Sequence, residues 1–246
     1  MTGHHRLEVS DLTVSYNRVP ALHHIEFATS CGQCVGLMGP NGAGKTTLLK
    51  TLAGLLTPET GSIFFHGRKV SRANTDFAYL PQRENVDWDF PLTVRGLVEM
   101  GRYLRVGWAR RFRKSDDEAV QSAIDQMRLG DLEKRQISAL SGGQQQRAFL
   151  ARSLAQEAHV FLLDEPFTGL DEPAREGLSN TLRELAATGK LIIASHHDLG
   201  TAEALFSEVL FLNGELIASG STGVAFTKEN IDRTYGTLAF SGKKSA

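Results

Sequence analysis

A stretch of nine residues, Gly39-Pro-Asn-Gly-Ala-Gly-Lys-Thr-Thr47, has the residue types and spacing of a phosphate-binding loop. It matches the pattern GxxxxGK[ST]. Glycines let consecutive backbone N–H groups turn toward a phosphate, and the N-terminus of a following helix adds a positive dipole. Lys45 brings a full positive charge, and Thr46 offers a hydroxyl to magnesium. These residues predict a site for nucleotide phosphates.

Acidic residues follow a short apolar segment in the second half of the chain. Residues 160–163 are all apolar and are followed at once by Asp164 and Glu165. In a phosphate-loop fold, carboxylates at the carboxyl end of a buried strand lie where magnesium is held. The pair therefore predicts a magnesium site beside the loop. A similar apolar segment, 191–194, runs into the polar residues 195–198.

Strands and helices must position these groups, and the apolar pattern predicts both. Residues 35–38 are typical of a buried strand, and Leu48, Leu49, Leu52 and Leu55 recur at helical spacing after the loop. This gives strand, loop and helix in the order that the motif needs. Further strands are predicted at 7–16 with a break near residues 10 and 11, 22–27, 63–65, 77–80, 160–163 and 191–194, and a hairpin at 209–212 and 215–218 around Asn213-Gly214.

The middle of the chain, from about residue 87, changes to a helical pattern and is predicted to form an inserted helical subdomain. Residues 105–114 are basic with two aromatics, which suits either a solvated loop or contact with anionic lipid headgroups. The predicted helices are 93–103, capped by Thr93; 115–128, with Ser115 and Glu118 as a capping box; 141–156, capped by Ser141; and 171–189, beginning at Asp171 with Pro173 in its first turn.

Bulk composition disfavours several classes of protein. The chain has 246 residues and a formal net charge of −1, so it lacks the excess of Lys and Arg that neutralises nucleic-acid phosphates. No apolar run approaches the ~20 residues needed to span a bilayer, and residues 1–6 lack the apolar core of a signal peptide. We expect a cytosolic protein, free or docked to another component, that does not bind nucleic acid.

Cys31 and Cys34 form a lone CxxC motif, which raises the question of a redox or metal function. A thioredoxin-like pair needs a helix N-terminus to lower the thiol pKa, whereas Cys34 leads directly into the strand before the phosphate loop. Two thiols also supply only half of a tetrahedral zinc site. We interpret both cysteines as incidental or structural.

The phosphate loop is the first of six motifs that appear in order along the chain. They read GPNGAGKTT, YLPQR, LSGGQQQR, FLLDEP, GLD and SHHD. The sequence resembles the ATPase subunits of ABC transporters through roughly Gly236, and LSGGQQQR is decisive because other phosphate-loop NTPases lack it. The runs VDWDFP, MGRY and DEPF and the doubled HHD look like the subfamily that serves uptake of manganese, zinc or iron.

The resemblance implies an α/β fold, with a P-loop NTPase core of the ABC ATPase type, an N-terminal antiparallel β subdomain and an inserted α-helical subdomain. Residues 1–86 and 158–238 would form the core and β subdomain, 87–157 the helical subdomain and 239–246 a flexible tail. The implied function is ATP hydrolysis with Mg²⁺ that powers a metal importer. The alternatives are an importer or exporter of another substrate, or a soluble ABC ATPase outside transport.

Nucleotide contacts follow from the resemblance, position by position. Tyr16 would stack on adenine, although the residues alone favour core packing for a tyrosine at a strand end. Lys45 would contact the β- and γ-phosphates. The residues that would wrap the phosphates are Gly39, Pro40, Asn41, Gly42, Ala43, Gly44, Lys45, Thr46 and Thr47.

Metal and catalytic roles follow from the resemblance in the same way. Mg²⁺ would be held by Thr46, Gln82 and Asp164, and Gln82 would also sense the γ-phosphate. Glu165 would polarise the attacking water. His197 would contact the γ-phosphate, because it is the histidine that directly precedes the aspartate of the SHHD motif.

A second subunit is implied by the LSGGQQQR motif. Ser141, Gly142 and Gly143 would close on ATP held by the opposite subunit, with Asp171 near the same seam. A helix that begins Ser-Gly-Gly presents free N–H groups to an anion, so the physical argument agrees. One loop and one such motif per chain predict a head-to-tail dimer with two ATP at the interface, formed with an identical or a homologous ATPase subunit.

A membrane partner is also implied by the resemblance. Residues 82–91 would contact an integral membrane permease, and Trp88 and Phe90 suit either an apolar groove for a partner helix or the core of the helical subdomain. The residues leave both possibilities open. An extracytoplasmic metal-binding protein would belong to the same system, and the ATPase would lie on the cytoplasmic face of the membrane as a peripheral subunit.

Overall fold

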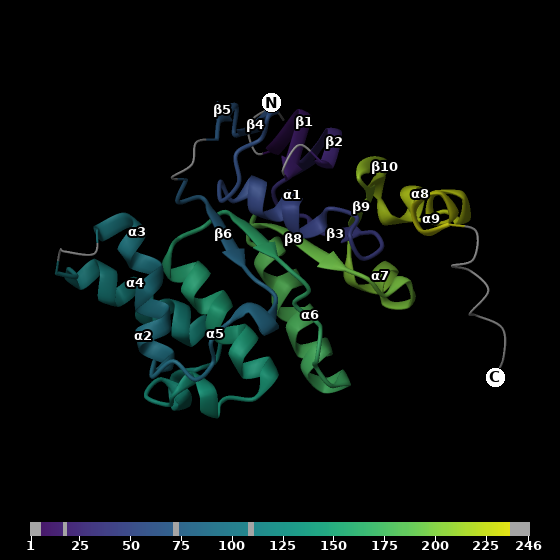
Figure 1. Cartoon of the computed structure of the whole chain (residues 1–246). Coiled ribbons are helices and arrows are strands. Elements are labelled where there is room, and N and C mark those ends of the chain that lie inside the picture. The colour runs from purple at the N-terminus through teal and green to yellow at the C-terminus, as the bar shows by residue number, and fades with distance from the viewer. Residues whose placement is uncertain (1–5, 17–18, 71–73, 108–110, 237–246) are drawn as a thin grey trace.

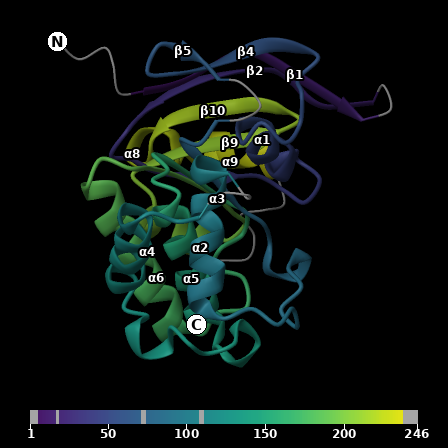
Figure 2. The same cartoon turned by 90° about the vertical axis from the view of Figure 1, so that its left-hand side faces the viewer.

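The computed structural model describes residues 6–16, 19–70, 74–107 and 111–236, and only the backbone of Tyr16. The expected tail at 239–246 and part of the basic segment 105–114 lie outside the described residues. A four-stranded sheet and a six-stranded sheet are stacked on each other. The helices between residues 94 and 187 lie on the face of the six-stranded sheet that points away from the four-stranded one (Figures 1 and 2).

An antiparallel sheet of four strands has the order β2-β1-β4-β5. The predicted break near residues 10 and 11 is a register shift between Val9 and Leu12, where Asp11 has a φ of 50°. Residues of β2 alternate between buried and exposed from Ile25 onward, which indicates that one face of the sheet lies on the core. The strands are β1 Arg6–Tyr16, β2 Val19–Ser30, β4 Thr60–Phe65 and β5 Arg68–Lys69.

The second sheet, called the core sheet, has six strands in the order β10-β9-β3-β8-β7-β6. All neighbours are parallel except the β9–β10 hairpin. β3, β7 and β8 are buried along their whole length, as parallel strands covered on both faces are. The predicted strands are confirmed here as β3 Cys34–Met38, β6 Phe77–Leu80, β7 Val160–Leu163, β8 Leu191–His196, β9 Glu208–Asn213 and β10 Glu215–Ser221.

Helix α1, Lys45–Leu52, buries three of its four predicted leucines in the core between the two sheets. The prediction for the fourth is wrong, because Leu55 lies beyond the helix and is 61% exposed. Gly54 has a φ of 72°, and the Leu55 amide donates to the Lys50 carbonyl at 2.9 Å. These contacts end the helix in a Schellman motif before Leu55 can reach the core.

The helical layer covers the other face of the core sheet. Thr93 caps α2, as predicted, by accepting a hydrogen bond from the Gly96 amide. The predicted capping box of Ser115 and Glu118 is wrong: the Arg113 amide donates to the Asp116 carboxylate at 2.9 Å, so α4 begins one residue earlier. Elements of the layer are α2 Val94–Glu99, a 3₁₀ turn Met100–Arg102, α3 Tyr103–Val106, α4 Lys114–Gln126, α5 Gly142–Ala155 and α6 Glu172–Ala187.

The Asp116 side chain, in the first turn of α4, fixes where this helix begins, because two groups hold its carboxylate in place. Besides the Arg113 amide, the buried Arg102 guanidinium donates to it at 2.7 Å. These two partners hold the pKa of Asp116 below its usual value. The sequence pattern did not reveal this long-range pairing.

Three short helices near the C-terminus were not predicted. They are α7 Leu199–Leu205, α8 Thr222–Ala225 and α9 Lys228–Tyr235. Each buries only one or two residues, so the apolar periodicity that indicates a helix is weak. Side-chain caps at Asp198 and Thr227 were the available signals.

Candidate active site

The phosphate-loop residues connect the end of β3 to the start of α1, as the motif requires. Gly44 is the N-cap of α1 and has a φ of 94°, a left-handed conformation that favours glycine. Gly39 has no room for a side chain, because a Cβ there would lie 2.1 Å from the Leu212 carbonyl oxygen. A tight strand-to-helix turn therefore fixes the loop.

The Lys45 ammonium folds back inside the loop. Its Nζ donates to the carbonyl oxygens of Gly39 at 2.8 Å and Pro40 at 2.9 Å, and the residue is buried. Burial lowers the pKa of Lys45, and the nearby carboxylates of Glu165 and Asp164 raise it in partial compensation. The Lys45 ammonium is thus held at a position where the oxygen atoms of a bound anion can replace the two carbonyl oxygens as hydrogen-bond acceptors.

Asp164 lies at the carboxyl end of β7 and is 2% exposed. It accepts hydrogen bonds from the hydroxyls of Thr46 at 2.7 Å, Tyr79 at 3.2 Å and Ser195 at 2.8 Å. Sequence reasoning missed Tyr79 and Ser195. They lie on β6 and β8, the neighbours of β7, so the rule that parallel strands end at one edge of a sheet was the available signal.

Glu165 has a φ of 49°, a left-handed conformation that is uncommon for a residue other than glycine. Its amide donates to the Ser195 hydroxyl at 2.7 Å, and the Thr168 hydroxyl donates to its Oε2 at 3.1 Å. His197 Nδ1 lies 4.0 Å from the same oxygen. Unusual backbone conformations cluster at functional sites, which suits a carboxylate beside a phosphate loop.

A cavity of about 580 Å³ opens at this edge of the core sheet. Residues 41–47 of the loop line it together with Gln82 and Glu165, because β3, β6 and β7 all end there. The full lining is Ala21, Asn41, Gly42, Ala43, Gly44, Lys45, Thr46, Thr47, Gln82, Glu84 and Glu165.

The two histidines after β8 lie in different environments. His196 is buried, and its Nε2 pairs with the Thr201 hydroxyl at 2.8 Å. Burial lowers the pKa of His196 to about 4, so the ring is neutral at physiological pH. The His197 side chain is 57% exposed and lies toward Glu165. His197 is thus the more accessible of the two rings, but it does not line the nucleotide cavity, and its contact with the γ-phosphate stays a prediction.

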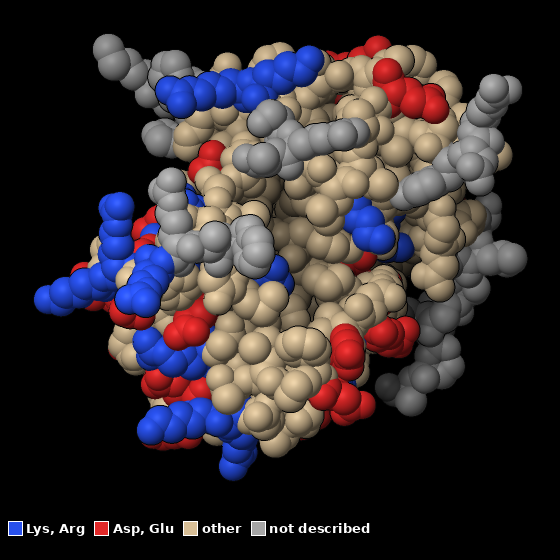
Figure 3. All heavy atoms as spheres, turned by 60° about the vertical axis from the view of Figure 1, so that its left-hand side comes forward, with Lys and Arg blue, Asp and Glu red and all other residues tan. Residues whose placement is uncertain are grey.

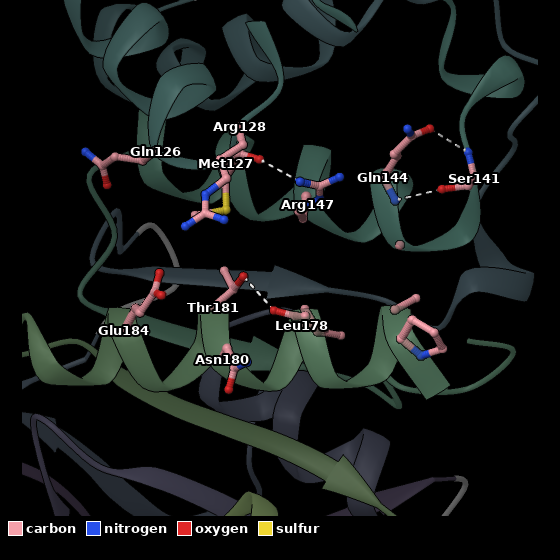
Figure 4. A pocket seen from close by; sticks show the side chains of 14 residues that line it. Gln126, Met127, Arg128, Ser141, Gln144, Arg147, Leu178, Asn180, Thr181 and Glu184 are labelled. Atoms are coloured by element: carbon pink, nitrogen blue, oxygen red, sulfur yellow. Dashed lines mark hydrogen bonds between the residues drawn. The ribbon is translucent and has the colours of Figure 1, made fainter. Parts of the chain in front are cut away.

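Ser141, Gly142 and Gly143 lie apart from the phosphate loop of their own chain. Ser141 forms a capping box with Gln144 at the start of α5, and Asp171 caps α6 by accepting from the Ala174 amide at 3.0 Å. Ser141 and Gly143 line a groove of about 560 Å³ between α5 and α6 (Figure 4). No residue of 39–47, all of which the structure describes, lines this groove.

The predictions for the aromatic residues Trp88, Phe90 and Tyr16 have different outcomes. Trp88 is partly buried and packs against the core: its indole donates to the Arg83 carbonyl at 2.8 Å, and its ring packs edge-on against Phe149. Phe90 is 55% exposed and is the more accessible of the two aromatics, while Trp88 lines a cavity with Gln82 and Glu165. The Tyr16 side chain lies outside the described residues, and its contact with adenine stays a prediction.

Charges of both signs occupy the face shown in Figure 3. Basic and acidic side chains are interspersed over its lower left part. A nucleic-acid-binding surface gathers Lys and Arg into one patch or stripe instead. The absence of nucleic acid from the function stays a prediction.

Thiol chemistry gives a first testable prediction. Cys31 and Cys34 are both free, and burial raises the pKa of Cys34 to about 12. Cys34 is then almost entirely a neutral thiol at pH 8, whereas the thiolate is the reactive form. We expect iodoacetamide to leave Cys34 unmodified in the native protein and to label it after unfolding, as measured by peptide mass spectrometry. Rapid native labelling of Cys34 would contradict its buried position.

Comparison with known proteins supplies the family. The sequence profile of the ABC transporter family matches residues 22–168. The chain is 44% identical over 230 residues to the manganese transport system ATP-binding protein MntB of Bacillus subtilis, covering 94% of this chain and 92% of that protein. It is 43% identical over 230 residues to the zinc transport system ATP-binding protein TroB of Treponema pallidum, covering 94% and 86%.

Solved structures agree with the family in their fold. A transporter described as being of the metal-chelate ABC type, in an inward-facing conformation, matches with a TM-score of 0.83 and 27% identity, covering 94% of this chain and 88% of that one. A nucleotide-free ATP-binding cassette from an ABC transporter matches in fold, with a TM-score of 0.79, 20% identity and 94% of each chain covered. The predicted fold class is therefore confirmed.

No helix within the described residues is long and apolar enough to cross a bilayer. The motif set, the loop geometry and the matched profile agree with one another. The chain belongs to the ABC transporter family and is one of its ATP-binding ATPases.

Proposed function

We propose that this ABC ATPase powers the import of a divalent metal ion, manganese, zinc or iron, through a separate membrane permease. The observation that carries the proposal is 42–44% identity to manganese and zinc transport ATP-binding proteins over 94–97% of the chain. The alternatives are transport of another substrate in either direction, or an ABC ATPase without a transporter. The names of these relatives favour metal transport over both.

ATP hydrolysis would depend on positioning rather than on covalent chemistry, because phosphoryl transfer asks the protein mainly to hold charge and orient water. Lys45 and the loop amides bind the β- and γ-phosphates, and Lys45 exchanges its two carbonyl contacts for phosphate oxygens. Glu165 orients and polarises the attacking water, while His197 contacts the γ-phosphate. Gln82 senses the same phosphate across the cavity, and Tyr16 stacks on adenine.

The residues present also fit Mg²⁺. Magnesium prefers oxygen ligands, and Thr46, Gln82 and Asp164 offer a hydroxyl, an amide oxygen and a carboxylate. The Thr46 hydroxyl already donates to the Asp164 Oδ2 at 2.7 Å. Tyr79 donates to the same oxygen, and Ser195 donates to the Asp164 Oδ1. When bound, the ion supplies positive charge to the phosphate oxygens. This chain's contribution is to keep these donors in place.

A second ATPase subunit would complete each site. Residues 141–143 and Asp171 line or cap a different part of the molecule from the loop at 39–47. We infer that they meet the loop of an opposite chain, identical or homologous, in a head-to-tail dimer with ATP at the seam. Hydrolysis then weakens the seam and lets the two subunits part. An isolated monomer would bind ATP and hydrolyse it poorly.

The permease would contact the chain near residues 82–91. Phe90 is exposed there. A cavity of about 400 Å³ beside β6 adds two further exposed apolar side chains, Leu55 and Leu104. Exposed apolar side chains around a hollow suit a partner helix. The ATPase would lie on the cytoplasmic face of the membrane, and an extracytoplasmic metal-binding protein would serve the same system.

Deletion of the gene tests the proposed substrate. We expect cells without it to take up less manganese, zinc or iron under metal starvation, because the permease would lack its source of energy. Elemental analysis of the cells measures all three metals. Normal levels of all three would contradict metal import.

A matched control separates transport from indirect effects of the deletion. A plasmid copy of the wild-type gene should restore uptake, and the Glu165→Gln variant should not. Fractionation adds a second arm: the ATPase should leave the membrane fraction when the permease gene is deleted. Co-sedimentation with ribosomes or DNA would favour an ABC ATPase outside transport.

A further inference from the structure

A thiol and two imidazoles lie at the amino-terminal edge of the core sheet, at the opposite end of its strands from the phosphate loop. Cys31 is in the turn before β3, His66 is in the turn between β4 and β5, and His159 directly precedes β7. The fold brings together three segments that are far apart in sequence. None of the three residues lines the nucleotide cavity.

Cys31 and His66 have the spacing of two ligands on one zinc ion. The Cys31 Sγ lies 3.6 Å from the His66 Nε2. Zinc–sulfur and zinc–nitrogen bonds of about 2.3 and 2.0–2.1 Å at a tetrahedral angle also place the two donor atoms about 3.6 Å apart. A thiol–imidazole hydrogen bond would have a similar length, so a third ligand decides between the two.

His159 can supply that ligand. Its ring centre is 6.2 Å from that of His66, whereas two imidazoles on one tetrahedral zinc have centres about 5 Å apart. The described residues contain no complete group of three such metal-binding side chains in this conformation, so the His159 ring must move closer. Its side chain is 46% exposed, which leaves the ring room to turn without disturbing the core.

Asp76 prepares His159 for this role. The Asp76 Oδ1 lies 3.3 Å from the His159 Nδ1, which leaves the Nε2 to face a metal. Proteins commonly orient a metal-binding imidazole with a carboxylate on its other nitrogen. The Asp76 carbonyl also accepts from the His159 amide at 2.8 Å, so the two residues are held together by the backbone.

We propose that Cys31, His66 and His159 bind one Zn²⁺, with a water as the fourth ligand. Thiolate and imidazole ligands suit zinc, whereas manganese and magnesium prefer oxygen. The ion would tie the β4–β5 hairpin to the edge of the core sheet. This site is independent of the proposed transport function.

Burial and the charge of Lys190 act on the Cys31 thiol in opposite directions. Burial raises the pKa of Cys31, and the nearby Lys190 ammonium partly offsets this effect. Zinc must therefore displace the thiol proton, and its affinity falls as the pH falls. The Lys190 ammonium donates to the Ala158 carbonyl at 2.8 Å, which directs it away from a ligand position.

Cobalt is a suitable probe because it occupies zinc sites and reports its ligands by absorption. One equivalent of Co²⁺, added to the reduced full-length protein in excess Mg²⁺, should give a thiolate charge-transfer band and the visible bands of a tetrahedral ion. Zn²⁺ should abolish both. Cys31→Ser should remove the charge-transfer band, and His66→Asn and His159→Ala should each weaken binding by about tenfold or more. Asparagine is chosen because His66 has a φ of 52°.

The matched control is Cys34→Ala, three residues away in the same segment but buried in the core. It should keep the full cobalt spectrum. No charge-transfer band in the wild type, or a band that survives in Cys31→Ser, would overturn the site. Unchanged Co²⁺ affinity in His159→Ala would show that His159 is not a ligand and would overturn the three-ligand site. X-ray absorption of the zinc-loaded wild type, which depends on no variant, should count one sulfur and two imidazoles; any other set overturns the proposal.

Discussion

Replacement of Glu165 by glutamine is expected to lower steady-state ATP hydrolysis by about 100- to 1,000-fold, the effect of removing one group that stabilises the transition state. The amide keeps the size of the side chain but cannot accept a proton from water. The Ser195 and Thr168 hydroxyls that position Glu165 remain available, so the loop should keep its shape. ATP binding should therefore persist while turnover is lost.

Two measurements test the Glu165 variant. Phosphate release gives the rate, and size-exclusion chromatography with ATP should show an accumulated dimer, because the seam no longer opens by hydrolysis. Glu172→Gln is the control, since Glu172 is exposed and its ion pair within the described part of the chain is with Arg175 in the next turn of α6. If Glu165→Gln keeps wild-type turnover, the water-activating role of this residue is wrong.

Removal of the Lys45 side chain is expected to act earlier, on nucleotide binding. Lys45→Ala should weaken ATP affinity by about 10- to 100-fold, the size of a lost hydrogen bond to a charged group, and turnover should fall further. The ammonium is the positive charge held inside the loop, and it also bridges the carbonyls of Gly39 and Pro40. Calorimetry with ATP and a phosphate-release assay measure the two effects.

Lys50→Ala separates this effect from damage to the helix. Lys50 lies in the last turn of α1 and does not line the nucleotide cavity. The Lys50→Ala variant should keep an ATP affinity close to that of the wild type. Equal losses in Lys45→Ala and Lys50→Ala would attribute the effect to the stability of α1 and would remove Lys45 from the phosphate site.

Local sequence patterns predicted most of the fold because they depend on neighbours in the chain. Apolar runs identified β3, β7 and β8, and glycines and a lysine at fixed spacing identified the loop between β3 and α1. Errors had more than one cause: Gly54 ends α1 locally before Leu55, whereas a distant group decides where α4 begins. Arg102 helps to place the start of α4 by holding Asp116, and the three short C-terminal helices bury too few residues to show a period.

The sequence by itself therefore determined the family, the residues of the loop and the acidic pair that follows β7. Only the tertiary structure decided which side chains meet. It placed the Tyr79 and Ser195 hydroxyls on Asp164, packed the partly buried Trp88 against the core and left Phe90 exposed. It also separated residues 141–143 from the loop and joined Cys31 to His66. The physical reason is that contacts across strands follow from the order and register of the sheet, which no short stretch of sequence contains.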